Sequence, residues 1–398
     1  MTKLKPNKKL IAWMRGIRRH LHEHPELPND EHHTSEYIQG KLDELGISYR
    51  SGLAGTGILA RLGNEDSESP CVALRADMDA LPLEEKTGLK FSSKISGVMH
   101  ACGHDGHIAM LLGAASLLKK SDLQGQVKLL FQPAEEGGGG AKSMINDGAL
   151  DGVDIIFGGH IDRHFKVGEI AVQEGIICAF TDGFLIEIKG RGGHAAKPHE
   201  TVDSIVVASL LVMSIQTLVS REINPSHPSV ITVGKINGGS APNVIADSAI
   251  LEGTIRTTHP GVRGNIFKGL KRMVKAVGDL HQAQISITFK EGYKPIINDQ
   301  YATSLARKSA EITIGADMIR GLSHPSMGGE DFSYYLDLVP GSFVRFGARK
   351  DDLVDAPAHS PRFDFDEAAL PVGASFLANV AITSIKELDS IKIKKTSL

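Results

Sequence analysis

The stretch Gly97-Val-Met-His-Ala-Cys-Gly-His-Asp-Gly-His107 is the part of the sequence around which the chain is organised. It combines histidines, an aspartate and one of only three cysteines, and a helix-compatible apolar run follows at residues 108–118. Sulfur and imidazole donors at the start of a helix suit a transition metal better than Ca²⁺ or Mg²⁺, which prefer oxygen ligands. Cys102 and His104, with one glycine between them, form the sharpest pair of candidate ligands. Two residues do not complete a metal site, so the rest of the chain must supply the other ligands.

Length and composition indicate a soluble globular protein with two domains. The chain has 398 residues, more than one hydrophobic core usually supports, and its 41% hydrophobic and 23% charged residues are ordinary. A net charge of -3 offers no basic surface for nucleic acid or an anionic membrane. No run approaches the roughly 20 apolar residues of a membrane span. Three cysteines form no even disulfide framework, so we expect a reducing compartment and a cytoplasmic protein.

Polar residues follow several short β-like runs, and helical segments lie between these runs. The runs at 71–75, 127–132 and 154–157 lead to the following candidates: Asp77 and Asp79, Glu135 and Glu136, and His160. A later run at 342–347 precedes a loop that contains His359. In open α/β sheets, ligands bind outside the carboxyl ends of the strands. The sequence therefore predicts an α/β domain whose candidate site residues gather at one end of its strands.

The pattern changes after residue 181. Strand-like, helical and strand-like runs follow one another at 184–189, 202–219, 229–236, 250–256, 261–277 and 284–289. This β-α-β-β-α-β order is typical of the ferredoxin-like split motif. It predicts an inserted domain at 183–290, between two parts of a first domain at 1–182 and 291–398. The free edges of such a sheet suggest, as a hypothesis, pairing with a second copy of the chain.

A second histidine-rich stretch, Arg18-Arg-His-Leu-His-Glu-His-Pro25, ends the first predicted helix at 8–24. One interpretation is a solvated helix end that the proline terminates. The other is a position on the rim of a functional site. The sequence alone leaves both open.

The candidates at the strand ends and in the loops form the inventory that a two-metal hydrolase needs. They are Asp77, Asp79, Cys102, His104, Glu135, Glu136, His160 and His359. Several of them would hold the ions, while one carboxylate stays off the metals to take a proton from the attacking water. Adjacent side chains after a strand diverge, so one glutamate of the pair 135–136 can bind metal while its neighbour faces the water. Each of these residues, taken alone, could instead order a turn, lie in a solvated loop or be a structural histidine. It is implausible, however, that all of them would gather by chance at the same end of a sheet.

Seven motifs, in order along the chain, resemble those of the M20 metallopeptidase family. They are Arg75-Ala-Asp-Met-Asp-Ala-Leu-Pro82, Met99-His-Ala-Cys-Gly-His-Asp-Gly-His107, Gln132-Pro-Ala-Glu-Glu136, Gly190-Arg-Gly-Gly-His-Ala-Ala-Lys-Pro-His199, Ala241-Pro-Asn-Val-Ile245, Gly328-Gly-Glu-Asp-Phe-Ser333 and His359-Ser-Pro-Arg-Phe363. The resemblance is to the amidohydrolase branch, which includes hippurate hydrolases, aminoacylase-type N-acyl-amino-acid amidohydrolases and auxin-conjugate hydrolases. It extends from about residue 15 to residue 385.

This resemblance implies a zinc-exopeptidase-like catalytic domain that a ferredoxin-like lid and dimerisation domain interrupts, and a homodimer or higher homo-oligomer. It implies two divalent ions per subunit (Zn²⁺, Mn²⁺, Co²⁺ or Ni²⁺), held by Cys102, His104, Glu136, His160 and His359, with Cys102 as the bridging ligand. Glu135 would be the general base. His194 and Asn243 would contact the substrate carbonyl or stabilise the oxyanion, and Asp77 and Asp79 would orient metal ligands. We expect Arg256 to bind the substrate carboxylate, because a guanidinium suits bidentate carboxylate binding.

The resemblance implies hydrolysis of the amide bond of N-acyl-L-amino acids, such as acetyl or benzoyl conjugates. Arg163 and Ala246 stand where the family often has proline, which leaves the specificity of the substrate pocket open. One alternative is a dipeptidase or carboxypeptidase of the same fold. Another is a metal-dependent binding protein without catalysis, although the presence of Glu135 disfavours it.

Overall fold

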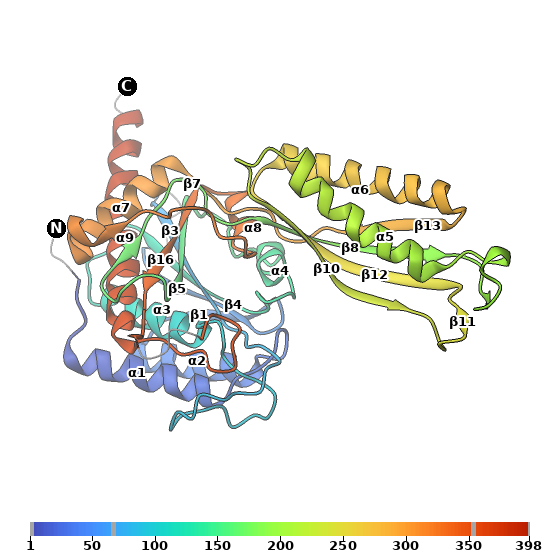
Figure 1. Cartoon of the computed structure of the whole chain (residues 1–398). Helices are drawn as coiled ribbons and strands as arrows, with labels where there is room; N and C mark the ends of the chain where they lie inside the picture. Colours follow the sequence, from blue (N-terminus) through green and yellow to red (C-terminus); the bar gives the residue numbers. More distant parts are fainter. Residues whose placement is uncertain (1–3, 65–68, 352–355, 397–398) are drawn as a thin grey trace. The chain divides into compact units, whose positions relative to one another are not determined.

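The computed structural model describes residues 4–64, 69–351 and 356–396, and the chain forms two compact units (Figure 1). The first unit consists of Met1–Gly175, Ile296–Ser323 and Asp331–Leu398, and the second of Ile176–Pro295 and His324–Glu330. The second unit includes the predicted insertion at 183–290. The roles of that insertion as lid and dimerisation domain stay predictions.

The first unit is built on a mixed sheet of eight strands, in the order β1-β2-β4-β3-β5-β16-β6-β15. The strands are β1 (Tyr49–Leu53), β2 (Gly57–Gly63), β3 (Cys71–Asp77), β4 (Gln126–Gln132), β5 (Ile155–Asp162), β6 (Ile170–Ala171), β15 (Ile319–Arg320) and β16 (Gly341–Gly347). The four central strands β4, β3, β5 and β16 are parallel, so their carboxyl ends lie on the same side of the sheet. The predicted α/β class is confirmed.

Helices pack around this sheet. Those of the first unit are α1 (Lys8–Glu23), α2 (His32–Leu45), α3 (His104–Leu118), α4 (Gly140–Asn146), α7 (Gln300–Ile314), α8 (Ser333–Leu336) and α9 (Leu370–Thr396). Helix α3 packs against α1, α9 and β3, and every residue from His104 to Leu118 is buried. A helix that is apolar on all sides belongs in a core, so the apolar run at 108–118 explains its central position.

Strand β5 is longer than the sequence pattern predicts, because its pairing with β16 continues beyond residue 157. His160 lies opposite Arg345 in this parallel ladder, and the strand ends only at Asp162. The expectation that His160 follows the end of a strand is therefore wrong. Asp77 is likewise the last residue of β3 and does not lie beyond it.

The second unit contains a four-stranded antiparallel sheet in the order β10-β12-β8-β13. Its elements are β8 (Phe180–Lys189), β9 (Gly193–His194), α5 (Ser204–Thr217), η2 (Leu218–Glu222), β10 (Ser229–Gly238), β11 (Val244–Ile245), β12 (Ser248–Thr257), α6 (Pro260–His281) and β13 (Gln284–Lys290). Alternate residues of β8 are buried beneath the two long helices, as the alternating pattern of the sequence predicts. The β-α-β-β-α-β order is present, and β10 and β13 are the edge strands.

Two helical segments of the described chain are long and apolar enough to cross a membrane by length and composition alone. They are Ser204–Glu222 and Glu367–Ser390. The second is 78% buried inside the structure, and the first packs Val207, Leu211 and Ile215 into the core of the second unit. Helices that form a protein core have the same composition, so these two segments are weak evidence for a membrane span.

Candidate metal centre

Six candidate residues from separate parts of the chain meet in the first unit. Cys102 and His104 lie at the start of α3, Glu135 and Glu136 follow β4, His160 lies in β5, and His359 lies in the loop after β16. Two groups each bring one donor atom per residue within 4.8 Å of the others: Cys102 with His104 and His160, and Cys102 with Glu136 and His359. Because Cys102 belongs to both groups, the arrangement fits two neighbouring cations that share one thiolate.

The backbone at the start of α3 allows Cys102 and His104 to reach the same space. Gly103 between them has a φ of 98°, a left-handed conformation that side chains other than glycine's rarely tolerate. A Cβ at this position would also lie 3.4 Å from Ile161 of β5. The turn that presents both candidate ligands therefore requires a glycine at this position of the motif.

Hydrogen bonds fix which ring nitrogen each histidine presents. Nδ1 of His104 donates to the backbone oxygen of Asp79 at 2.9 Å, and Nδ1 of His160 donates to the backbone oxygen of Ile161 at 2.7 Å. When such a ring is neutral, as a metal ligand must be, its lone pair lies on Nε2. Nε2 of His104 is buried and has no hydrogen-bond partner within the described part of the chain, and Nε2 of His160 lies 3.3 Å from Cys102 Sγ. An unsatisfied buried nitrogen of this kind fits a metal ligand.

Asp79 connects two of the candidate ligands. One of its carboxylate oxygens accepts a hydrogen bond from the backbone N–H of Glu136 at 2.8 Å, and the other lies 3.4 Å from Nδ1 of His104. The side chain is 1% exposed, so few other groups compete for it. Asp79 therefore has the contacts expected of a residue that orients ligands.

Asp77 acts through His107, the last residue of the histidine-rich motif. Nδ1 of His107 donates to Asp77 at 2.6 Å, and its Nε2 accepts the backbone N–H of Ile161 at 2.9 Å, next to His160. Arg75 donates to the other oxygen of Asp77 at 2.6 Å and to Asp331 at 3.0 Å. Every one of these side chains is buried, so the end of β3 is rigidly held.

Sequence reasoning missed Glu31, which controls the turn before the two glutamates. Its buried carboxylate accepts hydrogen bonds from the backbone N–H of Ala134 at 2.9 Å and from the Thr56 hydroxyl at 2.7 Å. Ala134 has a φ of 53°, which is unusual for a residue with a Cβ. The bond from Glu31 holds this conformation and so directs Glu135 and Glu136. Nothing in the local sequence around residue 31 signals this role, because the contact joins distant segments.

We expect Glu31→Ala to destabilise the protein and to disorder this turn. The substitution leaves the buried N–H of Ala134 and the Thr56 hydroxyl without their acceptor, at a cost of about 1–3 kcal/mol each. Urea denaturation measures the loss. Glu31→Gln keeps one acceptor oxygen and is the matched control, so equal losses for both variants would contradict this role.

The electrostatic field of the centre favours a cation. Hydrogen bonds that the His359 ring donates to Cys102 and Glu136 raise the pKa of this histidine to about 10. Burial lowers the pKa of His104, but the Asp77 carboxylate and its other partners outweigh this and raise it well above its usual value. Burial and the Glu136 carboxylate together raise the pKa of the Cys102 thiol. Without a metal, protons on these side chains balance the negative charge of the neighbouring carboxylates. A divalent ion at the same place would balance that charge instead.

His194 and Asn243 meet in the second unit. They lie on a two-stranded ladder of β9 and β11, where His194 pairs with Val244 and the backbone oxygen of Asn243 accepts the N–H of Ala195 at 3.1 Å. Nδ1 of His194 accepts the backbone N–H of Ala196 at 3.0 Å. The proton of the neutral ring then lies on Nε2, which leaves His194 an exposed hydrogen-bond donor.

Arg256 lies on β12, opposite Val230 and Thr181 of the neighbouring strands. Its side chain is half-buried, and burial lowers its pKa, while the Asp182 carboxylate opposes the change. Arg263 forms the bidentate bond to Asp182 at 2.7 and 2.8 Å. The proposed role of Arg256 toward a substrate stays a prediction.

Comparisons with known proteins give a consistent result. The sequence model of the group described as "Peptidase family M20/M25/M40" matches residues 73–383. The chain is 43% identical over 380 residues to the N-acetyl-L-cysteine deacetylase of Bacillus subtilis, covering 95% of this chain and 89% of that protein. It is 40% identical over 392 residues to the IAA-amino acid hydrolase ILR1-like 4 of Arabidopsis thaliana, covering 97% and 88%.

A similar structure has also been solved. It is a Bacillus subtilis protein described as a dinuclear metal binding peptidase from the M20 family, 34% identical to this chain. The two structures align with a TM-score of 0.83 over 96% of this chain and 99% of the other. The likeness thus extends over both units of the chain and beyond its individual motifs.

Proposed function

The chain belongs to peptidase family M20/M25/M40 and is a hydrolase that acts on amide bonds, and from this premise we propose that it cleaves N-acyl-L-amino acids at a dinuclear metal centre. The observation that carries the proposal is the pair of candidate ligand groups that share Cys102, with Glu135 beside them. A Cys/His/Glu donor set accepts Zn²⁺, Mn²⁺, Co²⁺ or Ni²⁺.

In this proposal His104, His160 and Cys102 would hold one ion, and Glu136, His359 and the same cysteine would hold the other. When bound, the two ions supply a water of lowered pKa and polarise the substrate carbonyl. The buried nitrogen of His104 and the preset Nε2 positions of both histidines support this assignment. Asp77 and Asp79 keep the ligands in orientation through His107, His104 and the backbone of Glu136.

Glu135 is the general base. It is 5% exposed, and its carboxylate lies within 4.8 Å of ligand atoms of His104 and Glu136. It takes a proton from the attacking water and passes it to the leaving amine. Proton transfer by a positioned group of this kind contributes about 10²–10⁴-fold to a rate.

Residues of the second unit complete the proposed reaction. His194, through its Nε2–H, and Asn243 stabilise the oxyanion that forms on the acyl carbonyl, each for a factor of about 10²–10³ in rate. Arg256 binds the carboxylate of the amino acid, because a guanidinium matches a carboxylate in a bidentate geometry. The hydrogen bond that Nδ1 of His194 accepts supports the donor role of this residue.

The names of the relatives support this substrate class, since an N-acetyl-L-cysteine and an IAA-amino acid are both N-acyl amino acids. The test is a substrate panel on protein reconstituted separately with Zn²⁺, Mn²⁺, Co²⁺ and Ni²⁺. It should contain N-acetyl- and N-benzoyl-amino acids, an auxin conjugate and unblocked dipeptides. Higher kcat/KM for the acylated substrates supports the proposal, whereas a preference for dipeptides would indicate a dipeptidase or carboxypeptidase instead.

We also propose a cytoplasmic homodimer that pairs through the second unit. Its edge strand β10 exposes Val230 and Ile236, and α5 exposes Ile205, Val206 and Met213, which is 70% exposed. Exposed apolar residues beside a free strand edge favour association with a second copy. The thiols of Cys71, Cys102 and Cys178 form no disulfide, which suits a reducing compartment. Sedimentation equilibrium of the purified protein tests the dimer, and a monomer at all concentrations would refute it.

A further inference from the structure

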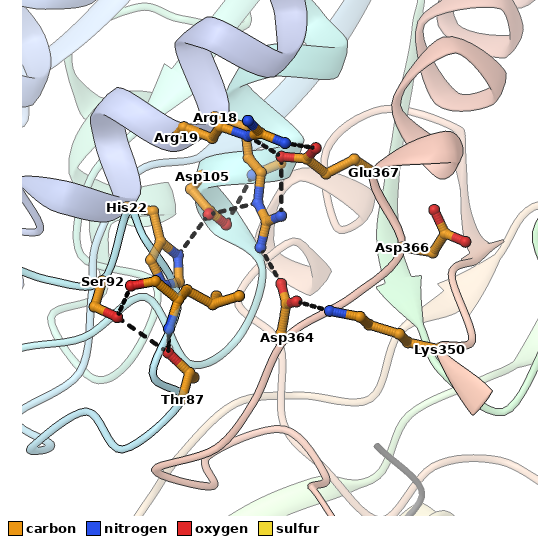
Figure 2. Close-up of polar contacts among 12 residues, drawn as sticks. Arg18, Arg19, His22, Thr87, Ser92, Asp105, Lys350, Asp364, Asp366 and Glu367 are labelled. Atoms are coloured by element: carbon orange, nitrogen blue, oxygen red, sulfur yellow. Dashed lines mark hydrogen bonds and ion pairs between the residues drawn. The ribbon is translucent and has the colours of Figure 1, made fainter. Parts of the chain in front are cut away.

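A buried network of charged residues lies beside the candidate centre in the first unit, and Figure 2 shows most of its members. We call it the Arg18 network, and it consists of Arg18, His22, Glu85, Asp105, Lys350, Asp364 and Glu367. Arg18 and His22 belong to the stretch that the sequence left open between a solvated helix end and the rim of a site. Both are 1% exposed, so the solvated interpretation is wrong for these two residues, although Arg19 and His20 are exposed.

Arg18 contacts three carboxylates at once. Its guanidinium donates to Asp105 at 3.2 Å, to Glu367 at 3.2 Å and to Asp364 (Figure 2). It also lies over the ring of Phe365, 4.0 Å from the centroid. A planar group with several fixed donors can make these contacts together, whereas the single ammonium of lysine cannot.

The three carboxylates belong to segments that carry different candidate ligands. Asp105 directly follows His104 in the first turn of α3 and lies near Cys102 in sequence. Asp364 and Glu367 lie on the chain between His359 and α9. Arg18 therefore bridges the segment of Cys102 and His104 to the segment of His359, although it contacts no ligand itself.

His359 is the ligand that depends most on such a bridge. Its side chain is 54% exposed, and its φ of 66° is a left-handed conformation that needs support from its surroundings. Two backbone bonds also hold its loop, from His359 N to Ala101 O at 2.8 Å and from Lys86 N to Pro361 O at 2.7 Å. The Arg18 network anchors the far end of the same loop through Asp364, which Lys350 also binds at 2.5 Å.

We infer that Arg18 is a positioning residue of the dinuclear centre, which sets the location of His359 relative to Cys102 and so determines the affinity for the ion that these two residues and Glu136 hold. This inference rests on the proposed function, because it assumes the two metal sites. The inference predicts different effects on the two metal sites. The group of Cys102, Glu136 and His359 includes a ligand from the His359 loop, whereas the group of Cys102, His104 and His160 does not. Asp105 keeps its contact with Nδ1 of His22 at 2.9 Å when Arg18 is lost, whereas Asp364 loses its tie to α1, so loss of Arg18 should weaken the first site selectively.

The experiment is a titration of the metal-free full-length protein with Co²⁺ against a competing chelator, which yields two dissociation constants. In Arg18→Lys we expect one constant to rise about 10- to 100-fold, the range for lost ligand-supporting contacts, and the other to stay unchanged. Arg19→Lys is the matched control. Arg19 is the adjacent arginine, binds Glu367 at 2.7 and 2.9 Å, and is half-exposed, so both constants should equal those of the wild type.

A double-mutant cycle with His359→Ala identifies the site through which Arg18 acts. If Arg18 works through His359, then Arg18→Lys should add little to the loss of metal affinity in the His359→Ala background. Thermal unfolding of each metal-free variant is recorded in parallel. A lower melting temperature with both Co²⁺ constants unchanged, or an equal rise in both constants, would show a purely structural ion pair and overturn the inference.

Asp364→Asn is the second variant, in case Arg18→Lys does not fold. It weakens the tie to the His359 loop while Arg18 keeps Asp105 and Glu367 as partners, so we expect the same selective rise in one constant. Wild-type constants in this variant would overturn the inference. Failure of the wild-type protein to bind two Co²⁺ ions would instead refute the dinuclear centre of the proposed function, independently of any Arg18 variant.

Discussion

Glu135→Gln should lose nearly all amide hydrolysis and keep both metal ions. Glutamine has the shape of glutamate but cannot accept a proton from the attacking water, so kcat should fall by about 10²–10⁴-fold. The side chain is buried beside the proposed ligands, and the substitution retains its volume there. Steady-state kinetics and elemental analysis on the same preparation measure the two quantities. Wild-type turnover in this variant would remove Glu135 from its role as base.

The adjacent residue provides a matched comparison. Glu136→Gln removes a proposed ligand, so it should lower the metal content as well as the rate. The two glutamates stand side by side in sequence, yet Glu136 belongs to the group of Cys102 and His359, and its backbone N–H donates to Asp79 at 2.8 Å. If both variants kept two ions, the division of roles between the pair would be wrong.

Cys102→Ala should lose metal from both sites. Its sulfur belongs to both ligand groups, so its removal takes one ligand from each ion at the same time. The remaining proposed ligands, three imidazoles and the Glu136 carboxylate, would also lack the negative charge of the thiolate, which balances part of the charge of two dications. We expect elemental analysis to find well under two ions per chain after dialysis, and activity to fall with the metal content.

Cys71→Ala is the control for this loss. Cys71 is a buried thiol at the start of β3, whereas the candidate site residues Asp77 and Asp79 lie at and beyond the other end of that strand. This variant should keep the wild-type metal content. An unchanged stoichiometry in Cys102→Ala would refute the ligand role of Cys102 and the shared-thiolate arrangement with it.

Much of the fold could be predicted because it depends on local patterns. The alternating apolar residues of β8 face the core of the second unit, and the apolar run after the histidine-rich motif forms the buried helix α3. Periodicity of this kind depends on near neighbours in sequence, so it is visible without the fold. The full length of β5 could not be predicted in this way, because its continuation through His160 depends on pairing with β16, a strand from the other end of the chain.

The residues of the proposed site also fall into two sets, those that the sequence motifs revealed and those that only the fold revealed. Chemically suitable residues stood out in short motifs, such as Cys102 and His104 with one glycine between them. The supports of the site did not stand out. Glu31 reaches the backbone of Ala134 from a distant helix start, and Arg18 reaches two carboxylates near the C-terminal helix. Glu31 has no local pattern that distinguishes it from a surface glutamate, and the stretch that contains Arg18 did not show which of its two arginines is buried.

The sequence by itself determined the order of elements, the family and the set of residue types that suits two metal ions. Only the tertiary structure decided which histidine nitrogen faces the candidate centre, that Cys102 lies in both candidate ligand groups, and that a buried arginine joins the two segments that carry candidate ligands. The physical reason is the range of the interactions. Strand and helix patterns arise from neighbouring residues, whereas a metal centre and its supporting hydrogen bonds form between side chains that only the folded sheet brings within a few ångströms.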